Sequence, residues 1–147
     1  MDAAILWAGL AIGLAWFGVT LGEALVARTS IEVNAANPEM GPVFRKLTIL
    51  GIALVESAAI YGLIMALLII YAGEVTQWQA ITAGLAVGLP GAAAGLGEAW
   101  IVVNTLKGLL RNPRAEKDLQ SNMILYIALV ESAAIYGLIT SLLILYS

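Results

Sequence analysis

Four glutamates interrupt long apolar stretches of this sequence: Glu23, Glu56, Glu98 and Glu131. A charge at the centre of a lipid bilayer costs from about 2.5 to more than 10 kcal/mol, and acids kept there commonly carry a proton or a cation. The structural alternative is a protonated glutamate in an interhelical hydrogen bond, worth only about 0.6–2 kcal/mol. Because the acids recur in pairs at identical spacing, the pattern favours ion binding.

The glutamates belong to an internal repeat. The stretch "IALVESAAIYGL" occurs at Ile52–Leu63 and again at Ile127–Leu138. Aligning residues 5–72 with residues 80–147 needs no gap and gives 31 identities in 68 positions. The chain is therefore a tandem duplication with an offset of 75 residues.

The composition is that of a membrane protein. Hydrophobic residues make up 61% of the 147 positions and charged residues 12%, and the mean hydropathy is +0.94. Soluble domains carry about 25% charged residues. The absence of cysteine and histidine excludes disulfides, thiolate metal sites and histidine-based catalysis. No basic surface is present that would bind nucleic acid.

Helices must position the acids. A bilayer crossing needs about 20 residues, and four apolar stretches are long enough, at about residues 4–27, 47–72, 79–106 and 122–146. Backbone amides in hydrocarbon must pair internally, which favours helices. The predicted fold is all-α, with two tandem transmembrane hairpins in parallel orientation. Their predicted bounds are residues 1–73, with a loop at about 28–46, and residues 74–147, with a loop at about 107–121.

The basic residues predict the orientation. All seven lie in or beside the two polar loops: Arg28, Arg45, Lys46, Lys107, Arg111, Arg114 and Lys117. The positive-inside rule then places both loops in the cytoplasm and both termini outside. The N-terminal stretch lacks the positive region of a cleavable signal and is interpreted as a retained helix.

Each hairpin brings two acids to one depth. Glu23 lies 15 residues before Pro38 and Glu56 lies 18 residues after it, so two antiparallel helices carry them to similar heights. Ser57 and Tyr61 follow, and the tyrosine is expected to donate a hydrogen bond back to Glu56. Two close carboxylates in a low dielectric cannot both be ionised. The pair is neutral when both are protonated, or when one is ionised beside a monovalent cation. Ligands that are all oxygen suit Na⁺ or H⁺ rather than a transition metal.

The first helix of each hairpin is rich in glycine, which lets membrane helices approach closely. The second helices carry bulky aliphatic residues, which suit a lipid-facing layer. Because a lone four-helix chain would leave glutamates facing lipid, we expect a homo-oligomer. Trp16 and Pro90 interrupt the small residues of the first helices, and the sequence offers no reason for either.

The repeated "ALVESAAIYGL", the glycine-rich first helices and the "NP" loops resemble the proteolipid of rotary ATP synthases and ATPases, their c subunit. The duplicated form resembles the K proteolipid of V/A-type enzymes, whereas the local motif is similar to F-type c subunits, especially sodium-dependent ones. The resemblance implies a non-catalytic rotor-ring subunit of a prokaryotic cell membrane. Its implied partners are further copies in a ring, a stator subunit of the a or I type, central-stalk subunits and membrane lipids.

The resemblance also implies the ion site. Glu56 and Glu131 would carry the ion, which is Na⁺ or, alternatively, H⁺, with no organic cofactor. The implied ligands and supporting groups are the hydroxyls of Ser57 and Ser132, the carbonyls of Leu54 and Leu129, and the phenols of Tyr61 and Tyr136. Glu23 and Glu98 stand where sodium-type members usually have glutamine, and sites of the family straddle neighbouring hairpins. Ala58 and Ala133 stand where some sodium-binding members have a hydroxyl, which keeps the proton alternative open.

Two other functions fit four helices with buried acids. One is a small ion-coupled secondary transporter, which predicts a dimer rather than a large ring. The other is a purely structural bundle, which predicts that replacing Glu56 and Glu131 together by glutamine leaves function unchanged.

Overall fold

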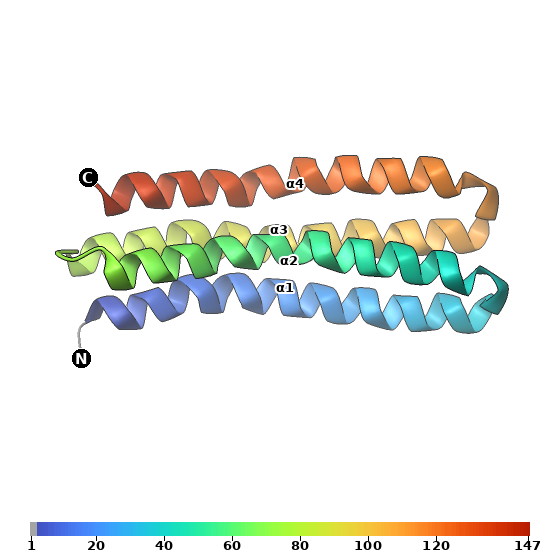
Figure 1. Ribbon diagram of the computed structural model, residues 1–147, viewed down its shortest axis with the longest axis horizontal. Coiled ribbons are helices and arrows are strands. Elements are labelled where there is room, and N and C mark those ends of the chain that lie inside the picture. Colours follow the sequence, from blue (N-terminus) through green and yellow to red (C-terminus); the bar gives the residue numbers. More distant parts are fainter. Residues whose placement is uncertain (1–2) are drawn as a thin grey trace.

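The computed structural model describes residues 3–147, with side chains from Ile5 onward, and is all-α as predicted. Four long helices run antiparallel and side by side (Figure 1). They are α1 (Ala3–Ala36), α2 (Gly41–Tyr71), α3 (Gln77–Arg111) and α4 (Glu116–Leu145), with single 3₁₀ turns η1 (Pro38–Met40) and η2 (Pro113–Ala115) inside the hairpins. All four are long and apolar enough to cross a membrane.

The helices are longer than the apolar stretches, so the prediction of loops at 28–46 and 107–121 was wrong in extent. Within these two predicted loops the chain leaves α-helical conformation only at residues 37–40 and 112–115. Residues 28–36 are polar but contain neither proline nor glycine, and Arg28 bonds Glu32 one helical turn on, at 2.8 Å. The polar residues predict where a helix leaves the membrane, but the helix itself continues to the residue before the proline turn.

Proline ends α1 and reverses the chain. The residue before a proline is disfavoured in helical conformation, and Asn37 before Pro38 has φ −144° and ψ 84°. Its side-chain oxygen accepts a bond from the Met40 amide at 3.4 Å. Asn112 before Pro113 has nearly the same backbone angles, φ −139° and ψ 85°. The repeated "NP" therefore builds two similar tight turns.

The link between the hairpins is a short turn followed by a helix start. Gly73 has φ +76°, a conformation that other residues rarely adopt. The Thr76 hydroxyl accepts from the Gln79 amide, and the Gln79 side chain accepts in return from the Thr76 amide at 3.0 Å. This capping box begins α3.

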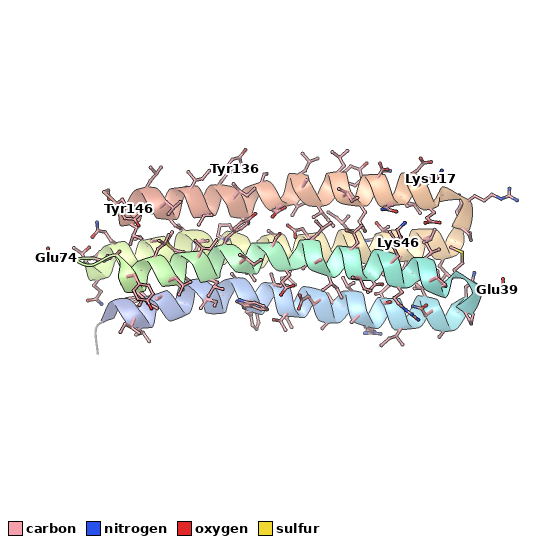
Figure 2. The ribbon with its side chains drawn as sticks, viewed as in Figure 1. Glu39, Lys46, Glu74, Lys117, Tyr136 and Tyr146 are labelled. Atoms are coloured by element: carbon pink, nitrogen blue, oxygen red, sulfur yellow. The ribbon has the colours of Figure 1, made fainter. Side chains whose placement is uncertain are left out.

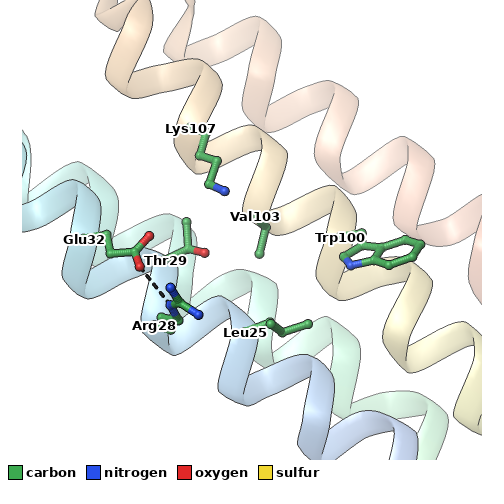
Figure 3. Close-up of a pocket in the computed structure, with 7 residues that line it drawn as sticks. All are labelled: Leu25, Arg28, Thr29, Glu32, Trp100, Val103 and Lys107. Atoms are coloured by element: carbon green, nitrogen blue, oxygen red, sulfur yellow. Dashed lines mark hydrogen bonds and ion pairs between the residues drawn. The ribbon is translucent and has the colours of Figure 1, made fainter.

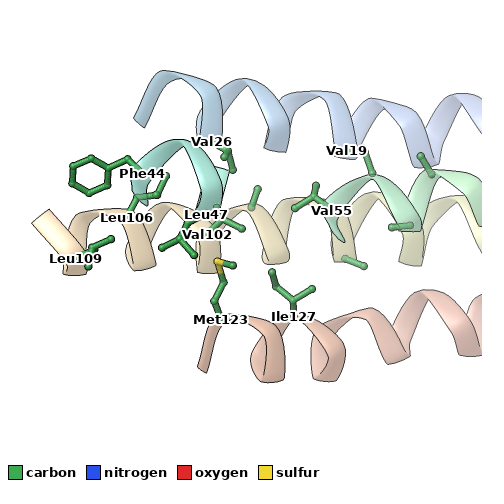
Figure 4. Packing of buried hydrophobic residues seen from close by; sticks show 14 of the residues in the cluster. Val19, Val26, Phe44, Leu47, Val55, Val102, Leu106, Leu109, Met123 and Ile127 are labelled. Carbon is green, nitrogen blue, oxygen red and sulfur yellow. The ribbon is translucent and has the colours of Figure 1, made fainter. Parts of the chain in front are cut away.

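Glycines bring α1 and α3 into backbone contact, as the glycine-rich first helices predict. A β-carbon added at Gly18 would collide with the backbone of Ala92, and one added at Gly22 would lie 2.8 Å from Cβ of Ala99. Around this contact a core of aliphatic side chains from all four helices is buried, including Val19, Val55 and Ile127 (Figure 4).

Beyond the glycines, towards the η1 and η2 turns, larger side chains separate α1 from α3. A groove of about 280 Å³ opens there, with Arg28 and Lys107 on its two sides and Trp100 at one end (Figure 3). Charged side chains cluster at the ends of the bundle, with Glu39, Lys46 and Lys117 near the turns and Glu74 at the opposite end (Figure 2). The flanks between the two ends are largely apolar.

The glycine contact yields a stability prediction. Gly18→Ala places a methyl group against the Ala92 backbone and is expected to destabilise the fold by about 1–3 kcal/mol through overpacking. Gly108→Ala is the matched control, because its nearest neighbour would be Leu119 Cδ1 at 3.5 Å, an ordinary contact. The measurement is the midpoint of helix loss in denaturing detergent. Equal midpoints for the two variants would show that close packing at Gly18 is not needed.

Candidate ion-binding site between the two hairpins

Glu131 of α4 is held by two hydroxyls of α2. Tyr61 Oη donates to Glu131 Oε1 at 2.7 Å, and Ser57 Oγ lies 2.7 Å from the same oxygen. Residues 57 and 61 are four apart, so both side chains lie on one face of α2. The acid of the second hairpin is therefore bound by the first.

This arrangement corrects the expectation that Tyr61 bonds the glutamate of its own helix. Tyr61 follows Glu56 by five residues, which is about 140° around a helix at 3.6 residues per turn. The two side chains therefore leave α2 in different directions. Glu56 is exposed at the surface of the described chain, whereas Tyr61 reaches across to Glu131.

Ser57 also contacts a backbone carbonyl. Its Oγ lies 2.6 Å from the carbonyl oxygen of Leu54 and 2.7 Å from Glu131 Oε1. A hydroxyl has one hydrogen to donate. If Ser57 donates it to Leu54, then Glu131 must be protonated and donate to Ser57, or a cation must lie among the three oxygens. The geometry suits either a proton or a small cation.

Glu98 of α3 is the other acid of the second hairpin. Its side chain is 0% exposed, and among residues described with side chains it is the only carboxyl group with both oxygens buried and without a hydrogen-bond partner. Its helix α3 packs against α4, which carries Glu131. An isolated ionised carboxylate cannot stay in such surroundings. Glu98 must therefore hold a proton or share a cation.

Four of these groups are joined across the hairpins by hydrogen bonds, and Glu98 lies buried on the neighbouring helix α3 without one. Glu98 and Glu131 come from the second hairpin, and Leu54, Ser57 and Tyr61 come from the first. In residues 3–147 no group of three or more histidine, cysteine, aspartate or glutamate side chains could hold a metal. Ligands that are all oxygen, without nitrogen or sulfur, match Na⁺ or H⁺ better than a transition metal.

The equivalent groups of the other repeat are brought together only in part. Glu23 of α1 and Glu56 of α2 belong to the same hairpin, and Glu56 is exposed. Ser132 Oγ donates to the Leu129 carbonyl at 2.7 Å, which repeats the bond of Ser57. Tyr136, however, is 66% exposed and points away from the other helices (Figure 2). One cluster is thus assembled around Glu131, whereas the equivalent groups of the other repeat stay split between the two hairpins.

The assignment of partners is what the sequence missed. The repeat and the family resemblance together supplied all ten candidate residues and implied that sites straddle neighbouring hairpins, but they did not say which hydroxyls serve Glu131. Helix geometry holds a signal for it, because positions +1 and +5 after a glutamate lie on a different face from the glutamate itself.

Known proteins resemble each half of the chain separately. The family of ATP synthase C subunits matches residues 6–69 and again residues 81–144. The chloroplastic ATP synthase c subunit of Cyanidioschyzon merolae is 38% identical over 73 residues, which is 50% of this chain and 90% of that protein. The ATP synthase c subunit of Syntrophobacter fumaroxidans is 36% identical over 69 residues, 47% of this chain and 77% of that protein.

Each of these relatives therefore spans about one hairpin of the present chain, in agreement with a duplication. Proteins of this family are non-catalytic, membrane-integral proteolipids of the ATP synthase complex, where their copies form rings. Four apolar helices of membrane-crossing length agree with an integral membrane protein. The chain belongs to the family of ATP synthase C subunits and carries two tandem copies of its helical hairpin.

Proposed function

We propose that the chain is a rotor-ring subunit that carries Na⁺, or alternatively H⁺, across the membrane by reversible binding at paired glutamates, coupled to ring rotation. One observation carries the proposal. The carboxyl group of Glu131 accepts from Tyr61 of the other hairpin while the neighbouring Glu98 is fully buried with no partner. A cation beside the two acids supplies the missing partner.

The chemistry of the site fits one monovalent ion. Glu131 ionised and Glu98 protonated together carry a single negative charge, which one Na⁺ neutralises. Oxygens of Glu131, Glu98 and Ser57 and the Leu54 carbonyl are the proposed ligands, and Tyr61 holds Glu131 in place. Without Na⁺, a second proton makes the pair neutral. The ion leaves only where water or a positive charge on the stator compensates the exposed carboxylate.

The split second site is proposed to close between neighbouring copies. Glu23 and Glu56 of one copy would meet Leu129, Ser132 and Tyr136 of the next. The exposure of Tyr136 and Glu56 in the single chain supports this. Each copy then brings two ion sites to the ring.

We further propose that the ends of the bundle near η1 and η2 face the cytoplasm of a prokaryotic cell and meet the central stalk. The seven basic residues near these turns support the orientation. ATP chemistry would occur elsewhere in the complex, because the sequence has no phosphate-binding loop.

Carbodiimide labelling tests the ion assignment on the purified oligomer. A carbodiimide that reacts with protonated carboxyl groups is expected to modify Glu56 and Glu131, mapped by mass spectrometry, and Na⁺ is expected to slow the reaction at fixed pH while K⁺ does not. Protection that is absent at every pH would exclude sodium and leave protons as the carried ion. An absence of labelling at both glutamates would contradict either assignment.

A further inference from the structure

Trp16 and Pro90 break the pattern of small residues on α1 and α3, and the repeat relates them. With the offset of 75 residues, Gly91 is the counterpart of Trp16, and Ala15 is the counterpart of Pro90. These two counterparts touch in the structure, because a β-carbon added at Gly91 would lie 3.1 Å from Cβ of Ala15. Gly91 and Ala15, which touch within the chain, are therefore the counterparts of the two exceptional residues, Trp16 and Pro90.

We propose that a second copy of this chain docks its α1 on the free edge formed by α3 and α4, so that Trp16 of one copy packs on Pro90 of the other. The inference rests on the proposed ring. It adds that two kinds of hairpin contact alternate around the ring, one lined by glycine within each chain and one filled by bulky side chains between chains.

Pro90 lacks only the neighbour that this docking supplies. Its counterpart Ala15 is fully buried between Gly62 of α2 and Gly91 of α3. Pro90 is only half-buried, although α4 covers one side of it, where a β-carbon added at Gly137 would lie 3.1 Å from its Cγ. The uncovered side of Pro90 is equivalent to the side of Ala15 that contacts Gly91. In the proposed docking, Trp16 of the next copy takes the place of Gly91.

The free edge contains an apolar groove that could accept a helix of the next copy. It has a volume of about 450 Å³ between α3 and α4, and its lining, mostly apolar, includes Gly97 and Tyr126. Gly22 and Gly51 are their counterparts in the first hairpin, and both are buried there against the second hairpin. The groove is therefore equivalent to the surface of the first hairpin that the second hairpin covers, but here no hairpin covers it.

The sizes of facing side chains are reversed between the two contacts. Within the chain, Gly51 faces Val102, since a β-carbon added at Gly51 would lie 2.6 Å from Val102 Cγ1. In the proposed contact between copies, Tyr126 of one copy takes the place of Gly51, and Ala27 of the next copy takes the place of Val102. A large residue then faces a small one. This complementarity selects a second copy over a lipid chain or an unrelated helix.

The face of α1 that carries Gly9 and Gly13 has room for a closely packed helix. Gly9 and Gly13 have nothing within 4 Å of an added β-carbon. Their counterparts Gly84 and Gly88 are in tight contact, with added β-carbons 3.0 Å from the Trp7 carbonyl oxygen and 2.9 Å from Leu14 Cβ. If the internal contact is repeated between copies, Gly9 and Gly13 allow the same close approach of a helix from the next copy.

Cysteine pairs test the docking in the assembled ring, because the chain has no native cysteine. Gly22 and Ala99 face each other inside the chain, with β-carbons 2.8 Å apart after substitution at Gly22; between copies the same positions are Ala24 and Gly97. A chain with Ala24→Cys and Gly97→Cys is expected to form disulfides between copies, seen as a ladder of oligomers on a non-reducing gel. The control with Gly22→Cys and Ala99→Cys is expected to cross-link within the chain and to give no ladder.

The outcomes separate this inference from the ring itself. A ladder in the first variant supports the docking. A ring of normal mass without a ladder overturns it and leaves the proposed function standing. The absence of any oligomer, with no ladder, overturns both.

A second measurement isolates the Trp16–Pro90 pair. Trp16→Gly restores the residue of the other repeat, removes the bulky partner and is expected to lower the temperature at which the ring dissociates in detergent. Pro90→Ala is expected to act less in the Trp16→Gly background than alone, because the two residues share one contact. Trp78→Gly, at a 75% exposed position near the start of α3, is the control. Because Trp16 also packs on the core of its own chain, the decisive outcome is the pair: an effect of Pro90→Ala that is the same alone and in the Trp16→Gly background would overturn the pairing.

Discussion

Glu131→Gln is expected to reduce ion translocation to background even though Glu56 is unchanged. The glutamine carbonyl can still accept from Tyr61, so the site keeps its shape, but the side chain can no longer alternate between charged and neutral forms. In a ring every site must pass the stator in turn, so one blocked site per chain stops rotation. Ion uptake by liposomes containing the complete enzyme measures this.

Glu116→Gln is the matched control for Glu131→Gln. Glu116 contacts Lys46 at 3.5 Å near the η2 turn, outside the ion site, and its replacement is expected to leave uptake close to normal. Glu56→Gln alone should abolish uptake as fully as Glu131→Gln. A variant at either glutamate that retained about half of the rate would show that the two sites work independently, which contradicts a rotating ring.

Glu98→Leu is expected to change stability and function in opposite directions. The carboxyl group of Glu98 is fully buried with both oxygens unpartnered, a situation that costs about 1–3 kcal/mol. An aliphatic side chain removes this cost, so the midpoint of detergent unfolding in buffer without Na⁺ should rise. In buffer with Na⁺, protection of Glu131 from carbodiimide should be lost.

Glu98→Gln separates the charge of this residue from its oxygen. It keeps an oxygen ligand and needs no proton, so Na⁺ protection of Glu131 should persist with a weaker dependence on pH. The proposed function gives Glu23 the equivalent role in the split site, so Glu23→Gln is expected to act in the same way only in the assembled ring. If Glu98→Leu destabilised the fold in buffer without Na⁺, Glu98 would have a structural partner within the protein.

Much of the architecture could be predicted from the sequence. Long apolar stretches in a chain with 12% charged residues leave few alternatives to transmembrane helices. The repeat fixed the number of hairpins, and "NP" marked both turns, because the residue before proline avoids helical conformation. The extent of the loops was mispredicted, because the polar residues 28–36 form helix readily once they leave the membrane.

The partners in the site could not be read from the repeat alone. Two identical hairpins allow Tyr61 to serve either Glu56 or Glu131, and only the packing of α2 against α4 decides for Glu131. The same holds for Trp16 and Pro90. Each looks like an exception on its own helix, and the contact between Gly91 and Ala15 shows how they are related.

The most direct test of the sodium site is a high-resolution structure of the assembled oligomer in Na⁺-containing buffer. We expect density for one ion touching carboxyl oxygens of Glu98 and Glu131, Ser57 Oγ and the Leu54 carbonyl. We expect a second ion between the Glu23–Glu56 pair of one copy and Ser132 of the next. Carboxyl groups hydrogen-bonded directly to each other in saturating Na⁺, with no ion between them, would contradict the sodium site.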